Sequence, residues 1–189
     1  MKKLVCCLVG LVTSLHLPAE SGTDHSTSSL KQRRECATQI EERSFAITMR
    51  DWTLLDQSGR AYIESCSALS ERADLAKAYG AVASANNEMG QYREALDQAQ
   101  AGITADYLET SSHLEKVRAL FALNRSIEAK EALEDADHVI HLAIKLNDAQ
   151  MATAHNDHER ESYKEESNRH RAQCMVLEEY RVLLALIRD

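Results

Sequence analysis

Proline occurs once in this 189-residue chain, at Pro18, so the long remainder contains no proline. Proline interrupts helices because it lacks a backbone N–H and clashes with the preceding turn. Glycine, the other strong helix breaker, occurs only six times. The chain is instead rich in Ala, Leu, Glu, Gln and Arg, which favour helices. The sequence therefore predicts an all-α protein with one domain and a core of its own.

The N-terminal segment has the pattern of an export signal. Two lysines precede an apolar run from Leu4 to Leu17, and small residues follow it. The run has fourteen residues, whereas a membrane-spanning helix needs about 20. We expect a signal peptide over residues 1–19, cleaved after Ala19 or Ser21, and a periplasmic or secreted protein without stable membrane insertion. A membrane anchor and a lipoprotein are the alternatives.

Charge and composition narrow the choice of partner. Residues 20–29 are small, polar and aperiodic, which predicts a disordered linker before a helical domain over residues 30–189. The formal net charge is −8, and removal of the leader makes it more negative because Lys2 and Lys3 are lost. Nucleic acid requires clustered Lys and Arg, and an anionic membrane surface attracts basic segments. We therefore expect a protein or peptide partner.

A helical repeat is clearest between Ala76 and Leu108. Two amphipathic stretches flank a glycine, and the second stretch carries small residues where two helices would cross. The residues that carry the pattern are Tyr79, Val82, Ala83, Gly90, Tyr92, Ala95, Ala99 and Gly102. This arrangement resembles a unit of the tetratricopeptide repeat family. The resemblance implies a short right-handed solenoid of antiparallel helical hairpins that binds partner proteins.

The pattern recurs on both sides of this unit. After 34 residues, Asn124 takes the place of the turn glycine, and Asn tolerates the same left-handed conformation. Forty residues before Gly90, Arg50 occupies the equivalent turn, and Asp51 is expected to cap the next helix. Its apolar stripe continues to Leu69, so we expect this helix to run about one and a half turns longer than the family norm.

We therefore predict about three hairpins over Cys36–Leu142, of which the first is a divergent capping hairpin. The family's frequent proline is missing, so the second helix of the third hairpin is free to extend past Leu142. A last helix is expected from Glu159 to Arg188, with a polar first half and an apolar second half. A terminal helix of this kind commonly caps the end of a repeat stack.

The cysteines predict one disulfide. Cys36 and Cys66 lie fifteen residues before and after Asp51. On antiparallel helices both would stand about 22 Å from the turn, at a rise of about 1.5 Å per residue. In an oxidising compartment they would join. The alternative is that Cys66 is an ordinary core residue, and Cys174 is expected to remain single.

The chain shows no catalytic motif, and we expect neither enzymatic activity nor a cofactor. Two histidine pairs, His138/His141 and His155/His158, have a spacing that can share one helix face. A zinc site needs a third and usually a fourth ligand, which the sequence does not specify. We therefore assign no metal, and a helical metal-dependent enzyme is the least favoured alternative.

The surface assigned to a partner is the concave face formed by the first helices of the hairpins. Its expected residues are Lys77, Ser84, Asn87, Leu114, Arg118 and Phe121. Family members that clamp a terminal carboxylate use Lys, Asn and Arg here, whereas this chain has Gly80 and Ser84 at two of those positions. We expect Leu114 and Phe121 to anchor an extended peptide or a helix. The alternative is that both are ordinary core residues.

The sequence thus predicts an exported adaptor or scaffold that binds a peptide or helix of another protein. This functional reading follows from family resemblance, and a fold does not determine a function. An oligomeric structural or immunity-type helical protein is the principal alternative.

Overall fold

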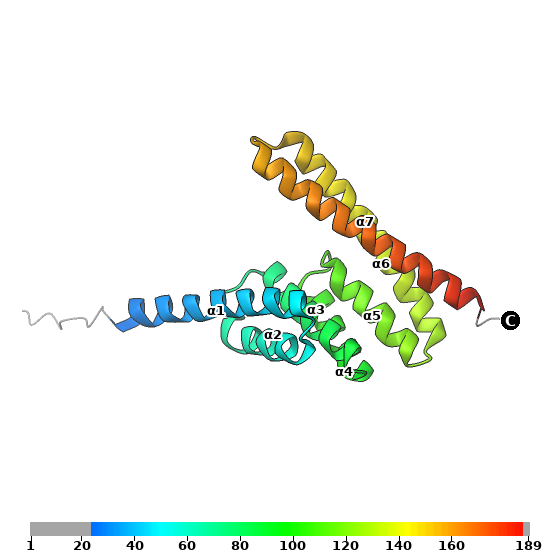
Figure 1. Cartoon of the computed structure of the whole chain (residues 1–189), viewed down its shortest axis with the longest axis horizontal. Coiled ribbons are helices and arrows are strands. Elements are labelled where there is room, and N and C mark those ends of the chain that lie inside the picture. The colour runs from blue at the N-terminus through cyan, green and yellow to red at the C-terminus, as the bar shows by residue number, and fades with distance from the viewer. Residues whose placement is uncertain (1–23, 187–189) are drawn as a thin grey trace, which may run out of the picture.

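The computed structural model describes residues 24–186, and it consists there of seven α-helices without a strand (Figure 1). The helices are α1 (Asp24–Met49), α2 (Trp52–Cys66), α3 (Arg72–Glu88), α4 (Tyr92–Ala105), α5 (Thr110–Ala122), α6 (Ser126–Thr153) and α7 (Asp157–Leu186). Consecutive helices pack as antiparallel hairpins, and α3 also packs beside α5. The all-α solenoid predicted from the sequence is confirmed.

The three predicted turns share one backbone geometry. Arg50, Gly90 and Asn124 adopt the left-handed conformation, with φ of 54°, 76° and 57°. In each turn the following residue donates its N–H to a carbonyl five positions back, at 2.9, 2.8 and 3.0 Å. This bonding pattern satisfies carbonyls that the helix end leaves open. As expected, Asp51 caps α2, because its carboxylate accepts the N–H of Leu54 at 3.0 Å.

The turns at Arg50 and Gly90 are farther apart in the sequence than the turns at Gly90 and Asn124, but α2 does not account for the difference. We expected α2 to be about one and a half turns too long, judged by its apolar stripe. It has 15 residues against 14 in α4, whereas α3 has 17 residues against 13 in α5. Leu69 lies beyond the end of α2 and is exposed, so the stripe overestimated the helix.

The expected linker over residues 20–29 is helical from Asp24 onward, which corrects that prediction. Aspartate, serine and threonine are common at helix starts, and a docked helix extends readily into such residues. Residues 20–23 and the expected signal peptide over 1–19 lie outside the described residues. Within the described range, no helix is long and apolar enough to cross a membrane.

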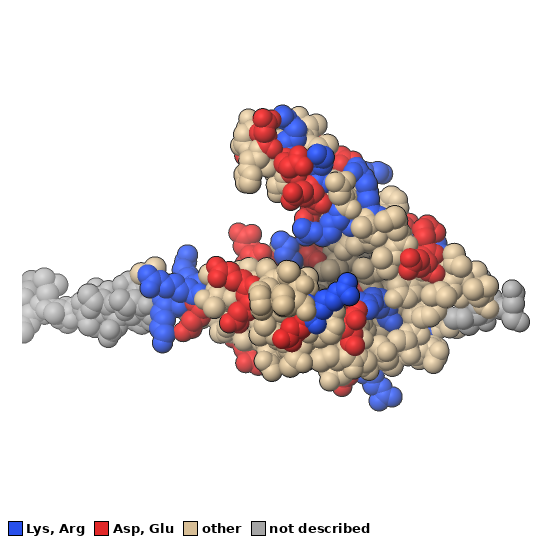
Figure 2. Space-filling view, viewed as in Figure 1, with Lys and Arg blue, Asp and Glu red and all other residues tan. Residues whose placement is uncertain are grey.

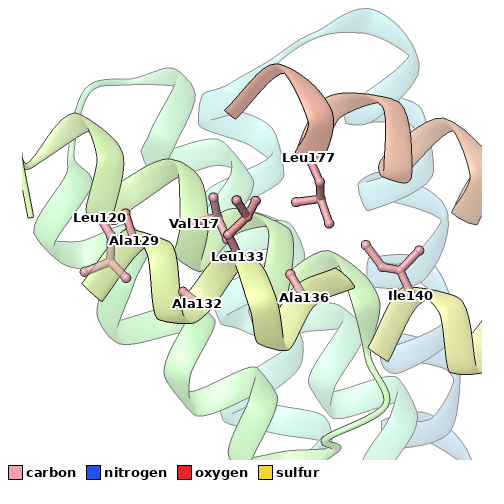
Figure 3. Packing of buried hydrophobic residues seen from close by; sticks show 8 residues of the cluster. All are labelled: Val117, Leu120, Ala129, Ala132, Leu133, Ala136, Ile140 and Leu177. Atoms are coloured by element: carbon pink, nitrogen blue, oxygen red, sulfur yellow. The ribbon is translucent and has the colours of Figure 1, made fainter. Parts of the chain in front are cut away.

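The largest apolar cluster joins α5, α6 and α7 (Figure 3). Its buried members are Val117, Leu120, Ala129, Ala132, Leu133, Ala136, Ile140 and Leu177. The cluster includes Ala129, Leu133 and Ala136, which lie 34 residues after Ala95, Ala99 and Gly102, the small residues expected at the helix crossing of the preceding unit. From α7 only Leu177 is fully buried in it.

The apolar second half of α7 covers the stack less completely than expected. Met175, Val182, Leu183 and Leu186 are exposed, although the cap predicted from the sequence would bury them. They lie on faces of α7 other than that of Leu177, and nothing within the described residues packs over them. A helix buries one stripe only, so a segment that is apolar on several sides stays partly exposed.

Helices α6 and α7 extend together beyond the stack as a two-helix projection (Figure 1). The extension of α6 past Leu142 is confirmed, since α6 ends at Thr153. Polar contacts join the two helices: Asp148 accepts a hydrogen bond from Ser167 at 2.8 Å and pairs with Arg171 at 3.2 Å. Nearer the stack, Asp137 pairs with Arg181 at 3.0 Å.

Helix α1 packs mainly on α2, and the expected disulfide joins them. The Cα atoms of Cys36 and Cys66 are 5.8 Å apart, and the two sulfurs are bonded. Beside the disulfide, Tyr62 and Ala78 form a small buried cluster. Cys174 is free and half-buried, as expected.

Candidate partner-binding groove

A groove of about 640 Å³ lies where residues of α1, α2, α3, α5 and α7 converge. Figure 2 shows the molecule hollowed between α1 and the projecting part of α6 and α7. The first helices of the three hairpins all contribute to it, together with α7. The groove is therefore the concave face that the repeat architecture predicts.

The floor of the groove consists of small side chains. Gly80, Ala81 and Ser84 come from α3, and Ser111 comes from α5. The two helices touch here, because a Cβ added at Gly80 would lie 2.6 Å from the Oγ atom of Ser111. Gly80 thus serves the contact between α3 and α5, and the short side chains of Ala81, Ser84 and Ser111 keep the floor low.

The two walls differ in character. Ile47 of α1 and Trp52 of α2 form an apolar wall, with Ile47 55% exposed. Glu166, Arg169 and Gln173 of α7 form a polar wall opposite. A ligand with one apolar and one polar side matches such a groove.

The polar wall is positioned by His170. This residue is buried, and its Nδ1 atom lies 3.3 Å from the hydroxyl of Thr110 and 3.1 Å from Oε1 of Gln173. Thr110 is the first residue of α5, so the contact fixes α7 against the start of the neighbouring helix. Buried polar groups require such partners, and the resulting bonds are specific in geometry.

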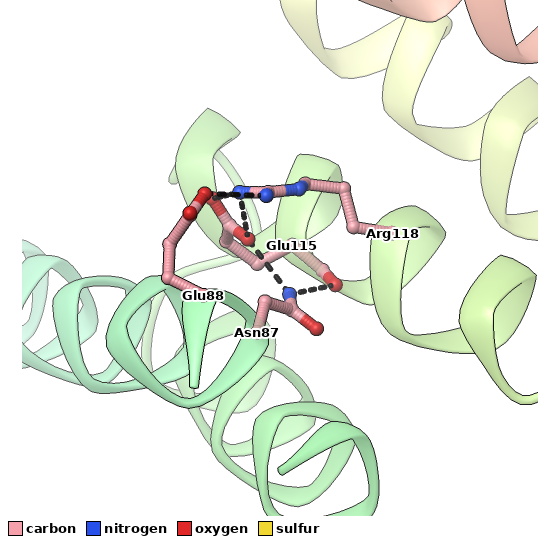
Figure 4. A network of polar contacts seen from close by, with 4 residues as sticks. All are labelled: Asn87, Glu88, Glu115 and Arg118. Carbon is pink, nitrogen blue, oxygen red and sulfur yellow. Dashed lines mark hydrogen bonds and ion pairs between the residues drawn. The ribbon is translucent and has the colours of Figure 1, made fainter. Parts of the chain in front are cut away.

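A polar network underlies one end of the groove (Figure 4). The amide of Asn87 donates to the Glu115 carboxylate at 2.7 Å and to the Glu115 backbone carbonyl at 3.0 Å. Arg118 pairs with Glu115 at 3.2 Å and with Glu88 at 2.6 Å. The network therefore ties the end of α3 to α5.

Burial controls the ionisation of this network. Burial raises the pKa of Glu115, and the Arg118 charge and the Asn87 amide oppose that change. Burial also disfavours the Arg118 charge, but the nearby carboxylates of Glu115 and Glu88 outweigh it and raise the pKa of Arg118. Arg118 thus remains charged, and it is held by the buried carboxylate of Glu115 and the exposed carboxylate of Glu88.

The six residues predicted from the sequence separate into three groups. Lys77 and Ser84 line the groove. Asn87 and Arg118 belong to the polar network beneath it. Leu114 packs against the main apolar cluster, and the Phe121 ring lies 5.4 Å from that of Tyr180 of α7. Leu114 therefore has the core contacts that we considered as the alternative, whereas half-buried Phe121 contacts a ring of α7.

Several groove residues were not found from the sequence. The apolar wall and the polar wall of α7 come together only through tertiary packing, so no local pattern points to them. Glu115 is different, because its spacing of three from Arg118 is a recognisable helical ion pair. Its burial could not be read from that spacing.

The histidine pairs do not meet additional ligands. Among residues 24–186, no group of three or more His, Cys, Asp or Glu side chains lies close enough to hold a metal ion. His141 instead contacts the backbone carbonyl of Asp137 at 2.9 Å.

The fold is similar to that of a solved structure, the TPR2B-domain:pHsp70-complex of yeast Sti1. The two chains are 17% identical, with a TM-score of 0.50, over 72% of this chain and 98% of that chain. Similarity at this identity concerns the fold alone, and it shows that the helices have a tetratricopeptide-like arrangement. No family model matches the sequence, and no curated protein matches it.

Proposed function

We propose that the protein is an exported adaptor that binds a helix or peptide of a partner protein in the groove between α1 and α7. The observation that carries this proposal is a floor of small residues between two taller walls. We expect such a shape to accept an extended peptide or one face of a helix. The similar yeast domain was solved as a complex with pHsp70, which supports a binding role for the fold.

Recognition of a terminal carboxylate is not part of the proposal. Of the residues expected at the family's clamp positions, Asn87 and Arg118 lie in the network beneath the groove, whereas Lys77 lines it. Asn87 and Arg118 already engage Glu115, and Arg118 also engages Glu88. A free carboxylate would have to displace these buried contacts, which is costly. The side chains of the ligand are therefore expected to determine binding.

Substitutions in the groove test the proposal. Ser84→Trp fills the floor, and Lys77→Glu reverses an exposed charge at its edge. The matched controls are Gln98→Trp and Arg93→Glu on α4, which does not line the groove. Affinity capture by the mature protein from periplasmic extract, with crosslinking, should lose its partner in both groove variants and keep it in both controls. Equal capture by all four variants would refute the groove.

Export is part of the proposal and has its own test. The apolar run after two lysines supports cleavage, and the oxidised pair Cys36–Cys66 suits an oxidising compartment. N-terminal sequencing of protein from the periplasm should find a start at Glu20 or Gly22. An intact leader on the periplasmic protein would contradict cleavage.

Self-association is a second candidate, favoured by the exposed apolar side chains at the end of the stack. Ile127 of α6 is 78% exposed, and Val182 and Leu186 of α7 are also exposed. Contiguous exposed apolar surface commonly marks an interface. Light scattering during gel filtration would show a dimer that Val182→Glu converts to a monomer. A monomer at all concentrations would exclude this candidate.

A further inference from the structure

Helix α1 has little to hold it in place by burial. Between residues 29 and 49 its buried side chains are Cys36, Arg43 and Ala46. Two of these are small, and the third is a charged guanidinium. Burial of apolar area is the main source of stability for a docked helix. Docking of α1 therefore needs another source of free energy.

The one large buried side chain of α1 opposes docking. The guanidinium of Arg43 lies 4.5 Å from the centre of the Tyr62 ring, where one of its nitrogens, Nη1, is buried without a hydrogen-bond partner. Burial lowers the pKa of Arg43, which means that its charge is less well stabilised there than in water. The cation–π contact offsets part of this cost.

The sequence of α1 also favours helix weakly. The hydroxyls of Thr38, Ser44 and Thr48 bond to carbonyls four residues back. Residues of this kind compete for backbone groups and lower helix propensity. Without docking, α1 would therefore lose helical structure as well as position.

The disulfide supplies the missing connection. Cys36 belongs to the exposed, polar α1, whereas Cys66 is fully buried at the end of α2. In that region the other polar links are hydrogen bonds from the Gln32 side chain to the Ser65 carbonyl at 2.7 Å and from the Gln39 side chain to the Ser65 hydroxyl at 3.5 Å. Since Ser44 and Ile47 of α1 line the groove, anything that detaches α1 removes the α1 part of the apolar wall and leaves Trp52 of α2.

We propose that the groove acquires its α1 wall only after Cys36 and Cys66 are oxidised, so that partner binding is switched on by disulfide formation. The two thiols lose two protons and two electrons, and an oxidised dithiol protein or glutathione disulfide accepts them and becomes two thiols. The part that concerns binding rests on the function proposed above. Before oxidation, the chain has an open groove and binds its partner weakly.

The test compares the oxidised chain with a Cys36→Ser/Cys66→Ser double variant by hydrogen exchange. Amides of α1 should exchange about tenfold faster or more in the variant, while those of α5, α6 and α7 stay within about twofold. Trp52, the only tryptophan of the chain, packs against Ala46 and lines the groove. Its quenching by acrylamide should rise in the same variant. Cys174→Ser is the control and should change neither measurement.

Two outcomes would overturn the proposal. Protection of α1 that stays within about twofold in the double variant would overturn the proposal. Loss of protection throughout α3 to α7 would also overturn it, since the disulfide would then hold the whole fold. If the double variant does not fold, the folded oxidised chain is reduced with dithiothreitol and its hydrogen exchange is measured again. The same two outcomes then decide the proposal.

A partner captured through the groove separates this inference from the proposed function. Its affinity should fall about tenfold or more in the double variant, by about 1.4 kcal/mol per factor of ten. Release of α1 with unchanged affinity would refute the oxidation switch and leave a binding function. Release of α1 with no groove partner under either condition supports oxidation-dependent assembly and contradicts the proposed function.

Discussion

Helices α1 and α7 are both long and polar, yet the protein holds them by different means. α7 inserts Leu177 into the main apolar cluster, and its outer half is joined to α6 by Asp148, Ser167 and Arg171. α1 contributes no comparable apolar side chain and is bonded covalently to α2. The comparison teaches that a long polar helix can be held by a short apolar stripe and an antiparallel partner along its length, or by a crosslink.

The largest expected effect is on the α7 side of this comparison. Leu177→Ala should lower the free energy of unfolding by about 3–4 kcal/mol, because it leaves a cavity among fully buried neighbours. Urea unfolding followed by circular dichroism measures the change. Leu186→Ala, at an exposed position of the same helix, is the control and should change little.

Removal of the disulfide should act on the α1 side. In the Cys36→Ser/Cys66→Ser variant the α1–α2 hairpin should unfold at a free-energy cost lower by about 3 kcal/mol, because its unfolded segment is no longer closed into a loop, while α5 to α7 keep their stability. Thermal unfolding in the presence and absence of dithiothreitol measures it in the native sequence. If dithiothreitol does not change the melting temperature of the native chain, the weak contacts of α1 are enough to hold it.

A smaller effect is expected in the projection. Asp148→Ala should cost about 1 kcal/mol, because the buried Ser167 hydroxyl loses its acceptor. The exposed pair with Arg171 adds little and is screened by salt. Comparison with Arg171→Ala at low and high salt separates the two contributions. A larger loss in Arg171→Ala than in Asp148→Ala would contradict this order.

The first turn offers a small gain in stability. Arg50 has a positive φ, a conformation that glycine adopts without steric cost. Arg50→Gly should stabilise the α1–α2 hairpin by about 0.5 kcal/mol after the entropy of glycine in the unfolded state is deducted. Gly90→Ala, at the equivalent turn of the next hairpin, should destabilise. Equal effects of both substitutions would contradict the shared geometry.

The smallest effect is a pH dependence of stability that comes from His113, which lies in α5 between the two terminal helices. Burial lowers the pKa of His113 below its ordinary value of 6.5, although the Tyr107 carbonyl 2.8 Å away favours the charged form. The unfolded chain therefore binds the proton first, so stability is full above pH 6.5 and falls as the pH drops toward the lowered pKa. His113→Gln should flatten this slope between pH 6.5 and 5 in urea titrations.

Local patterns predicted much of the repeat and little of the groove. The three turns follow from Gly90, Asn124 and Arg50 with their flanking residues, because turn geometry depends on nearby sequence. The small residues of α4 predict its crossing for the same reason. In contrast, the polar wall depends on where α7 docks, and the exposed apolar side chains of α7 depend on which face it buries. Both are set by tertiary contacts that a single helix pattern does not contain.

The left-handed turns also show that different residues can form one backbone geometry. Each turn is closed by backbone hydrogen bonds, and the three positions hold an arginine, a glycine and an asparagine. The reversal is thus specified by a torsion angle, which these three side chains reach at different steric cost. A search for turns of this kind in other chains has to compare the path of the backbone, because no single residue type identifies them.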